Sequence, residues 1–458
     1  MLFNKIFKRM FGVKAFYRQI VFCLCVYSVI HYLNAPQMYS LAHCTQSFII
    51  FVIEAFIVIR ERCKFNLLSF ELPFTLGFGF VCYAYPMVYY NLDPYFSLFA
   101  FDFPEQYITK GTALASVAFS FLVLGCLKFS NLPLKKVKYD SCIGSSRIKL
   151  TRITEFLLLI MIVSLIPVAL SGVYDMNWGA GGEIRGLLES LIYYTIFQKF
   201  YLNRGGTIKT LLRDNKNYFI MVLLYILLST IIGNRGNIIR IGLLCFVFYN
   251  LYIKKVSNVF ILTFLSVGMF LMYTVGAIRD SGSYQNARES SVSFWDFGRD
   301  LTINNRSEYV LMDIADRKGY TYGENFLGSL LSPIPFAQSS FLKVMGKSVE
   351  DISSGNLVTY DFFSKGDKDL VGLGTNIVGD VYLAFGLIGV IVLFYLLGTT
   401  ISKISYRANM GSPIMQFVYA ILLMNTVIWI RSDFFKPFQM VVWGLALYYI
   451  FDRKRIIR

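Results

Sequence analysis

Apolar residues occur in long runs along most of this chain, separated by short polar gaps. A helix that crosses a membrane needs about 20 mostly apolar residues, and runs of this kind recur up to residue 278 and again from residue 375. The pattern predicts an all-α polytopic membrane protein. Its expected spans number about twelve, at roughly 20–34, 41–59, 67–90, 108–127, 153–173, 187–202, 218–232, 238–253, 256–278, 375–398, 413–430 and 437–451.

One segment, residues 279–374, is long but not strongly apolar. It divides the chain into residues 1–278, the segment itself, and residues 375–458. Its 10 basic and 13 acidic side chains nearly balance, and it has too many aromatic and aliphatic residues for a disordered linker. We expect one large loop outside the membrane, folded as a small lid with one or two helices.

Within this loop the sequence predicts a helix from Ser293 to about Lys318. Arg299, Arg306 and Asp313 recur every seven residues and would share one face of it. That face is either a solvated polar stripe or part of a site, and the pattern leaves both readings open.

The basic residues are unevenly distributed along the chain. Most of the 44 Lys and Arg residues lie in alternate gaps between the apolar runs, with few acidic residues beside them. This alternation follows the positive-inside rule, so the basic gaps and both termini are predicted to be cytoplasmic and the large loop to lie on the other side. The formal charge of +16 therefore reflects topology, and we expect no nucleic-acid partner.

Metal and nucleotide chemistry find little support in the sequence. The chain has two histidines and eight cysteines, without zinc spacing or a disulfide framework. No Walker A, GxGxxG, HExxH or GxSxG pattern stands in a fitting context. Residues 367–369 have the DxD form used with metals and nucleotide sugars, but they lie in a polar, Gly-rich turn. We predict neither a metal site nor a cofactor.

Several arginines gather at the predicted outer ends of the spans. Arg235 lies between two runs that are short for a membrane about 30 Å thick, so its guanidinium would occupy a partly dry hollow. An arginine there is expected to bind an anion, with snorkelling to the headgroups as the alternative. Because guanidinium groups bind phosphate oxygens in two-point contacts, the group predicts a diphosphate site. Its other members are Arg279, Arg299, Arg306 and Arg431.

Short motifs resemble those of bacterial oligosaccharide repeat-unit polymerases, the Wzy-type O-antigen polymerases. In residues 431–434, an Arg-Ser-Asp-Phe turn is similar to the family's Arg-Gly-Asp-Phe. In residues 232–236, Asn234 stands where the family has Ser. The resemblance begins at about Tyr218, and it also includes residues 297–306, 319–327, 333–335 and 372–389.

The resemblance implies an enzyme that moves a growing glycan from undecaprenyl diphosphate onto a new lipid-linked repeat unit, outside the bacterial inner membrane. Its partners would be the lipid-linked donor and acceptor, membrane lipids and a chain-length regulator, with no metal or nucleotide required in principle. A general base must deprotonate the acceptor hydroxyl. Asp380 and Asp433 lead as candidates, followed by Asp300 and His31, although an acid beside an arginine can equally be its structural partner.

Two other functions share parts of this pattern. A flippase or other transporter of lipid-linked oligosaccharides would show internal repeats and charges along its spans, and the sequence shows no similarity between its halves. An O-antigen ligase would use the same donor, but it typically relies on a loop histidine, and residues 279–374 contain none. The polymerase is therefore the preferred prediction.

Overall fold

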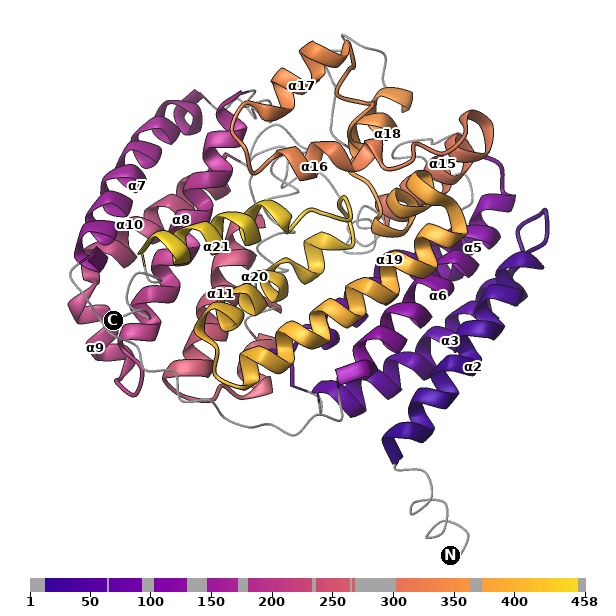
Figure 1. Cartoon of the computed structure of the whole chain (residues 1–458), viewed down its shortest axis with the longest axis horizontal. Coiled ribbons are helices and arrows are strands. Elements are labelled where there is room, and N and C mark those ends of the chain that lie inside the picture. Colours follow the sequence, from indigo (N-terminus) through magenta and orange to yellow (C-terminus); the bar gives the residue numbers. More distant parts are fainter. Residues whose placement is uncertain are drawn as a thin grey trace, which may run out of the picture.

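The computed structural model describes residues 13–63, 66–92, 103–129, 146–171, 180–232, 236–263, 266–267, 302–362 and 373–451, and within them all regular structure is helical (Figure 1). Each predicted span except the ninth coincides with a helix, and residues 256–278 lie mostly outside the described part. The all-α prediction is thus confirmed.

The helices before the large loop are α2 (Val13–Leu33), α3 (Leu41–Val58), η1 (Ile59–Cys63), α4 (Glu71–Ala84), η2 (Tyr85–Tyr89), α5 (Tyr90–Leu92), α6 (Gln106–Cys126), η3 (Leu127–Phe129), α7 (Ser146–Ser171), α8 (Ala180–Leu202), α9 (Ile208–Asp214), α10 (Lys216–Ile231) and α11 (Gly236–Tyr252).

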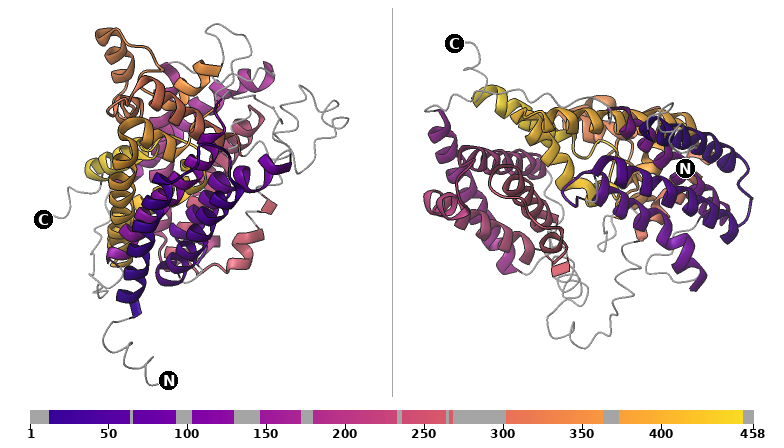
Figure 2. Two further views of the ribbon diagram at one scale, coloured as in Figure 1. Left: turned by 90° about the vertical axis from the view of Figure 1, so that its right-hand side faces the viewer. Right: turned by 90° about the horizontal axis from the view of Figure 1, so that it is seen from below.

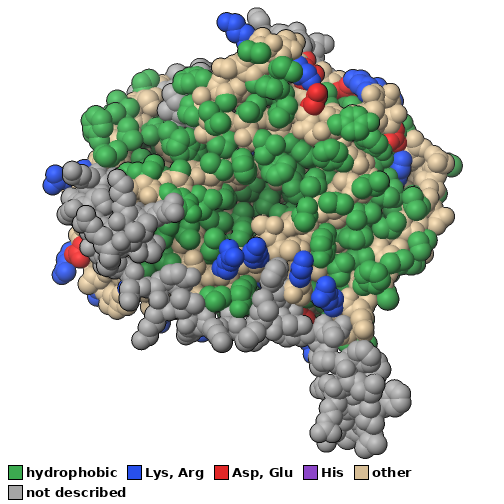
Figure 3. All heavy atoms as spheres, viewed as in Figure 1, with side chains coloured by type: hydrophobic (Ala, Val, Ile, Leu, Met, Phe, Trp, Pro, Cys, Tyr) green, Lys and Arg blue, Asp and Glu red, His purple; other side chains and the backbone are tan. Residues whose placement is uncertain are grey.

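The long apolar helices make this a multi-pass membrane protein. Among the residues described, five helical segments are long and apolar enough to cross a membrane, and further apolar helices are shorter. Figure 3 shows apolar side chains over the middle of one face, Lys and Arg along its lower edge, and charges of both signs near the top. The twelve-span count and the side of the loop stay predictions.

The membrane helices form two groups with separate apolar cores, and the view from below in Figure 2 separates them. The first core joins α2, α3, α4 and α6 to α19 (Ile377–Asn409), and the second joins α7, α8, α10 and α11 to α21 (Phe438–Phe451). Helix α20 (Pro413–Trp429) contributes Trp429 to the first core and Phe417 to the second. It therefore links the two groups.

Helices α6 and α19 approach each other closely through glycine. A Cβ on Gly398 would lie 2.1 Å from the carbonyl oxygen of Leu122, and one on Gly125 would lie 2.4 Å from that of Tyr395. Small residues allow such backbone contact between membrane helices, where packing replaces the hydrophobic effect as the driving force. This contact fixes the position of α19, whose first turn carries Asp380 of the candidate site.

The described part of the large loop, residues 302–362, is called the cap here. It lies at one end of the membrane helices, opposite the N-terminal end of α2 (Figure 1). It contains four α-helices, so the prediction of one or two was wrong. Three of them have nine residues or fewer, too short for helical periodicity to reveal. They are α15 (Ile303–Lys318), α16 (Leu327–Leu331), α17 (Ala337–Met345) and α18 (Ser354–Phe362), with the 3-10 turn η4 (Glu324–Phe326).

Helix α15 ends at Lys318 as predicted, but it begins at Ile303 instead of following Ser293. Arg299, the first residue of the predicted stripe, lies outside the described residues. Arg306 and Asp313 do lie on this helix, and they are only 4% and 8% exposed. For these two residues, the solvated reading is wrong.

Helix α19 is broken at Gly386, whose φ of 63° and ψ of −154° are almost exclusive to glycine. Such a break frees carbonyl groups that an unbroken helix would satisfy internally. The backbone N–H groups of Thr321 and Tyr322, in the cap, donate to the carbonyls of Leu383 and Ala384 at 3.0 Å each. The cap thus supplies hydrogen-bond donors to carbonyl groups beside the break. Irregular backbone in a membrane helix requires partners of this kind.

Candidate active site

Of the residues predicted for the site, the structure describes Arg306, Asp380, Arg431 and Asp433. Three of these meet where α19 begins, beside the turn between α20 and α21, and the cap covers both. The remaining four predicted residues, Arg235, Arg279, Arg299 and Asp300, lie outside the described residues.

Asp380 lies in the first turn of α19 and is completely buried. One carboxylate oxygen accepts a hydrogen bond from the Asn325 side-chain amide at 2.6 Å, and the other accepts from the backbone N–H of Phe434 at 2.7 Å. Asn325 belongs to the cap and Phe434 to the α20–α21 turn. Asp380 therefore joins three parts of the chain.

Asp433 immediately precedes Phe434 and is only partly buried. Its two carboxylate oxygens accept hydrogen bonds from the hydroxyls of Ser329, at 3.2 Å, and Ser354, at 3.3 Å. Both serines belong to the cap, and Ser354 also hydrogen-bonds the hydroxyl of Thr375. Among the described residues these hydroxyls hold the carboxylate in place, and no ion pair is formed with it.

Arg431 stands two residues before Asp433 in the same turn. Its Nε donates to the side-chain oxygen of Asn304 on α15. The amide nitrogen of Asn304 donates in turn to the carbonyls of Leu373, at 3.2 Å, and Thr375, at 3.1 Å. One cap residue therefore positions the guanidinium against the start of α19.

Arg306 follows Asn304 on α15, but its guanidinium lies over the ring of Tyr85, 5.6 Å from the centroid. Tyr85 begins η2, a π-helical turn that follows α4. Turns of this type occur frequently at functional sites. Arg306 thus contacts the turn that follows α4, whereas Asn304 contacts the residues just before α19.

A second polar cluster attaches α15 to the membrane helices. The Asp316 carboxylate accepts hydrogen bonds from Tyr107 and Lys110 on α6, at 3.1 Å each, and from Tyr382 on α19, at 3.2 Å. The hydroxyl of Tyr32 on α2 donates to that of Tyr382 at 3.3 Å. The Asp316 carboxylate therefore joins α15 directly to α6 and α19, and indirectly to α2 through Tyr382.

Glu308 lies two residues after Arg306 on α15, and its side chain is completely buried. Its Cα lies 2.9 Å from where a Cβ on Gly379 would be, so α15 and α19 touch through backbone at this point. Burial raises the pKa of the Glu308 carboxyl well above its ordinary value. This residue therefore favours the neutral form.

The turn that contains Arg235 is bordered by a described polar cluster. The hydroxyl of Tyr225 donates to the Glu189 carboxylate at 2.9 Å, and the amide of Asn237 donates to the same carboxylate oxygen at 3.3 Å. Glu189 is on α8, and Asn237 follows the turn on α11. The sequence suggested the turn but gave no role to Glu189.

His31, a minor candidate for the base, packs between α2 and α3. Its ring stacks on that of His43 with centroids 3.6 Å apart, and its Nε2 lies 3.0 Å from the hydroxyl of Ser47. These contacts give the imidazole a structural role in the packing of two helices.

Sequence reasoning missed the cap residues that hold the site. Asn304 and Asn325 lie within motif stretches recognised in the sequence, whereas Ser329 and Ser354 lie outside them. An asparagine inside a recognised motif was the available signal for the first two. No comparable signal marked the serines.

The fold and the site define a polytopic helical membrane enzyme whose polar cap covers carboxylates and an arginine at the ends of its membrane helices. The chain belongs to the family described as O-antigen polysaccharide polymerase Wzy, whose family model matches residues 16–453. The match extends the resemblance seen from Tyr218 onward into the first half. No curated protein and no solved structure matches the chain significantly. The protein is thus an O-antigen polymerase, which joins lipid-linked repeat units into polysaccharide.

Proposed function

We propose that the protein is a glycosyltransferase that works at the periplasmic face of the bacterial inner membrane. It would transfer the growing glycan from undecaprenyl diphosphate to a hydroxyl at the non-reducing end of a new lipid-linked repeat unit. The bond between the anomeric carbon and the diphosphate oxygen breaks, and a bond to the acceptor oxygen forms. The acceptor proton passes to a base, and the diphosphate leaves with the electron pair.

The observation that carries this proposal is the placement of Arg431 and Asp433 in one short turn beneath the cap. Asp433 accepts the proton, because its carboxylate is partly exposed and its described partners are hydroxyls. Arg431 stabilises the charge that develops on the diphosphate. Both groups are oriented before substrate arrives, which is the arrangement that lowers a barrier most.

Asp380 acts as a positioning residue in this proposal. Both of its oxygens already accept short hydrogen bonds, and it is fully buried. It fixes the backbone of Phe434 and therefore the neighbouring Asp433. Asp300 is kept as a second candidate base.

The other arginines are assigned to the diphosphate and the glycan that it carries. Arg306 approaches from α15 beside the ring of Tyr85, where an aromatic face can also stack on a sugar. Arg235, Arg279 and Arg299 complete the predicted set. Several guanidinium groups suit a diphosphate, because each can contact two phosphate oxygens.

Deletion of the gene tests the proposed function most directly. We expect surface glycan of a single repeat unit in place of a ladder of lengths, and an unchanged ladder would refute the proposal. Purified protein given lipid-linked repeat units should extend them in detergent. A transporter would leave them unchanged, and a ligase would need a lipopolysaccharide acceptor. A chain-length regulator, the further proposed partner, would change the distribution of lengths without abolishing polymer.

The proposed topology has about twelve spans with both termini in the cytoplasm. The apolar middle of the surface and the basic lower edge in Figure 3 support this orientation. A single cysteine introduced at Val344, on exposed α17, should react with a membrane-impermeant thiol reagent in intact spheroplasts. One introduced at Lys209 should react only after lysis, and the reverse pattern would invert the topology.

A further inference from the structure

The side-chain amide of Asn304 joins three segments that are distant in the sequence. Asn304 lies in the first turn of α15 and is only 2% exposed. Its nitrogen donates to the backbone carbonyls of Leu373, at 3.2 Å, and Thr375, at 3.1 Å, and its oxygen accepts from the Nε of Arg431. Because this side chain is buried, it influences a reaction at the site through these partners.

The two carbonyl groups fix the orientation of the amide. An NH2 group carries two donors, and each can meet one carbonyl oxygen. The reversed amide would place its own oxygen against two carbonyl oxygens and its NH2 group against the Nε–H of the guanidinium, so all three hydrogen bonds would be lost. An ionised aspartate would have no donor for the carbonyls, and leucine would have neither donor nor acceptor. The position therefore calls for an amide of this length.

Gly374 stands between the two carbonyl-bearing residues and leaves room for the amide. Its φ is 71°, and a Cβ on it would lie 2.7 Å from the side-chain nitrogen of Asn304. Residues with a side chain rarely adopt such a φ, and the added atom would push the amide away from both carbonyls. The turn before α19 is thus shaped to receive Asn304.

An acceptor at Nε orients the whole guanidinium group of Arg431. The group is planar and rigid, so the direction of its Nε–H bond also sets the directions of its terminal N–H groups. A disordered arginine would still attract a diphosphate through its charge. Stabilising the charge that develops as a bond breaks depends instead on donors that are aimed in advance. Loss of the Asn304 contact should therefore affect the chemical step more than substrate binding.

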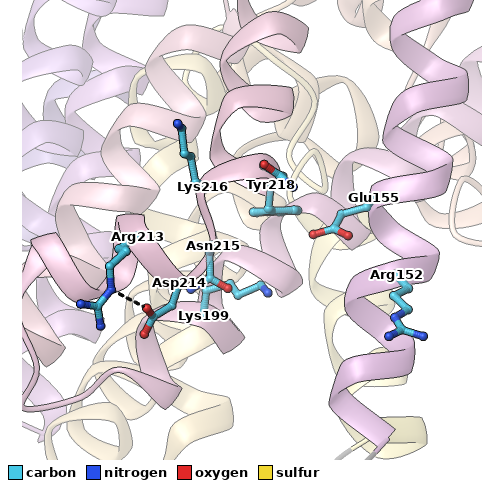
Figure 4. Close-up of a pocket in the computed structure, with 9 residues that line it drawn as sticks. Arg152, Glu155, Lys199, Arg213, Asp214, Asn215, Lys216 and Tyr218 are labelled. Atoms are coloured by element: carbon cyan, nitrogen blue, oxygen red, sulfur yellow. Dashed lines mark hydrogen bonds and ion pairs between the residues drawn. The ribbon is translucent and has the colours of Figure 1, made fainter.

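The polar pocket at the opposite end of the molecule provides a contrast. It lies among α7, α8 and the α9–α10 turn, and Asn215 is one of its lining residues. Figure 4 shows Arg152 and Lys216 of this pocket pointing away from each other. The amide of Asn215 donates to a backbone carbonyl as well, that of Leu211 on the adjacent α9, at 3.0 Å. Asn215 is therefore a matched asparagine, far from the cap.

We propose that Asn304 is a positioning residue for the polymerisation reaction. It holds the guanidinium of Arg431 in the orientation that the departing diphosphate requires. Since Asn304 belongs to α15, this contact exists only while the cap is docked against the turn before α19. The cap thereby orients a group that belongs to the α20–α21 turn. The proposal rests on the role given to Arg431 in the proposed function.

Steady-state kinetics of the purified full-length protein with lipid-linked repeat units test this proposal. Asn304→Leu removes the amide, and Asn304→Gln keeps it but moves it by one methylene. Both should lower kcat about tenfold or more and keep KM within about twofold, because a misplaced group fails mainly in the transition state. The matched control Asn215→Leu should keep both constants. Circular dichroism shows whether each variant is folded, and Asn304→Gln serves where Asn304→Leu does not fold.

Rescue by free guanidinium ion gives a readout that a purely structural role would not change. In Arg431→Gly, dilute guanidinium should restore part of the lost activity, because the oxygen of Asn304 still accepts one of its N–H groups. Ammonium ion lacks the planar fork and should restore less. The double variant Arg431→Gly/Asn304→Gln should show no rescue.

The outcomes separate this proposal from the proposed function. Equal rescue in the single and double variants would overturn the positioning role and leave that of Arg431 intact. Full kcat in the Asn304 variants while Arg431→Gly is inactive would do the same, as would an equal loss of kcat in Asn215→Leu. Full activity of Arg431→Gly would instead refute the role of Arg431 and, with it, that of Asn304.

Discussion

The two ends of this molecule hold their charges in opposite ways. Beneath the cap, Asp380 is wholly buried and Asp433 partly so, and their described partners are amide, hydroxyl and backbone N–H groups. At the other end, Arg213 and Asp214 are mostly exposed and pair with each other. The same residue types thus occupy very different surroundings.

This difference separates charges that hold a site from charges that set topology. A buried charge is expensive unless it is hydrogen-bonded, so the cap must supply donors at fixed positions. An exposed ion pair contributes about 0–1 kcal/mol and constrains little. Substitutions at the cap end should therefore have much larger consequences than those at the basic end.

Arg431→Ala should give the largest effect. We expect polymer formation to fall about 100-fold or more, because a positioned group that stabilises developing charge is lost. The measurement is conversion of lipid-linked repeat units by purified protein. Lys436→Ala, an exposed cation in the same turn, and Lys209→Ala at the basic end should each stay within about twofold. Comparable loss in these controls would remove the distinction between the two ends.

Replacing Asp433 and Asp380 one at a time should distinguish the base from the positioning residue. Asp433→Asn keeps the shape and an acceptor but loses the base, so activity should fall about 100-fold with little change in melting temperature. Asp380→Asn presents an NH2 group to one of two donors, and an unsatisfied buried donor costs about 1–3 kcal/mol. Its melting temperature should fall and its activity drop about tenfold. The opposite division would exchange the two assignments.

Gly386→Ala should loosen the cap from α19. Its backbone angles are strained for any residue with a Cβ, at about 1–3 kcal/mol, and the Cβ would lie 2.7 Å from the ring of Tyr320. Limited trypsin digestion should cut the cap sooner in this variant. Gly346→Ala is the matched control, because it adds the strain of a positive φ of 62° without any steric contact, and it should raise the digestion rate much less. Equal sensitivity would mean that the break does not anchor the cap.

The sequence predicted the membrane helices well because a long apolar run is a local signal. The cap was harder, because α16, α17 and α18 are short helices that owe their stability mainly to tertiary contacts. Their sequences carry no periodic pattern of sufficient length. Local reasoning therefore predicted the described membrane helices but not the short helices of the cap.

The candidate site was predicted in part for a related reason. Arg431 and Asp433 are only two residues apart in sequence, so one motif identified both. Their contacts with Asn304 and Ser354 join distant parts of the chain, and a single sequence does not reveal such contacts.

Glu308→Gln should give the smallest effect, and with the opposite sign. The pKa of Glu308 is raised in the folded protein, so the folded state binds more protons than the unfolded state between the two pKa values. Stability is therefore lost as pH rises above about 4.5, the ordinary value of such a group. Glutamine removes this loss. The apparent melting temperature of the variant at pH 8 should exceed that of the original protein by roughly a few degrees. The gain should shrink toward pH 5, and a gain that does not vary with pH would show that Glu308 does not titrate on unfolding.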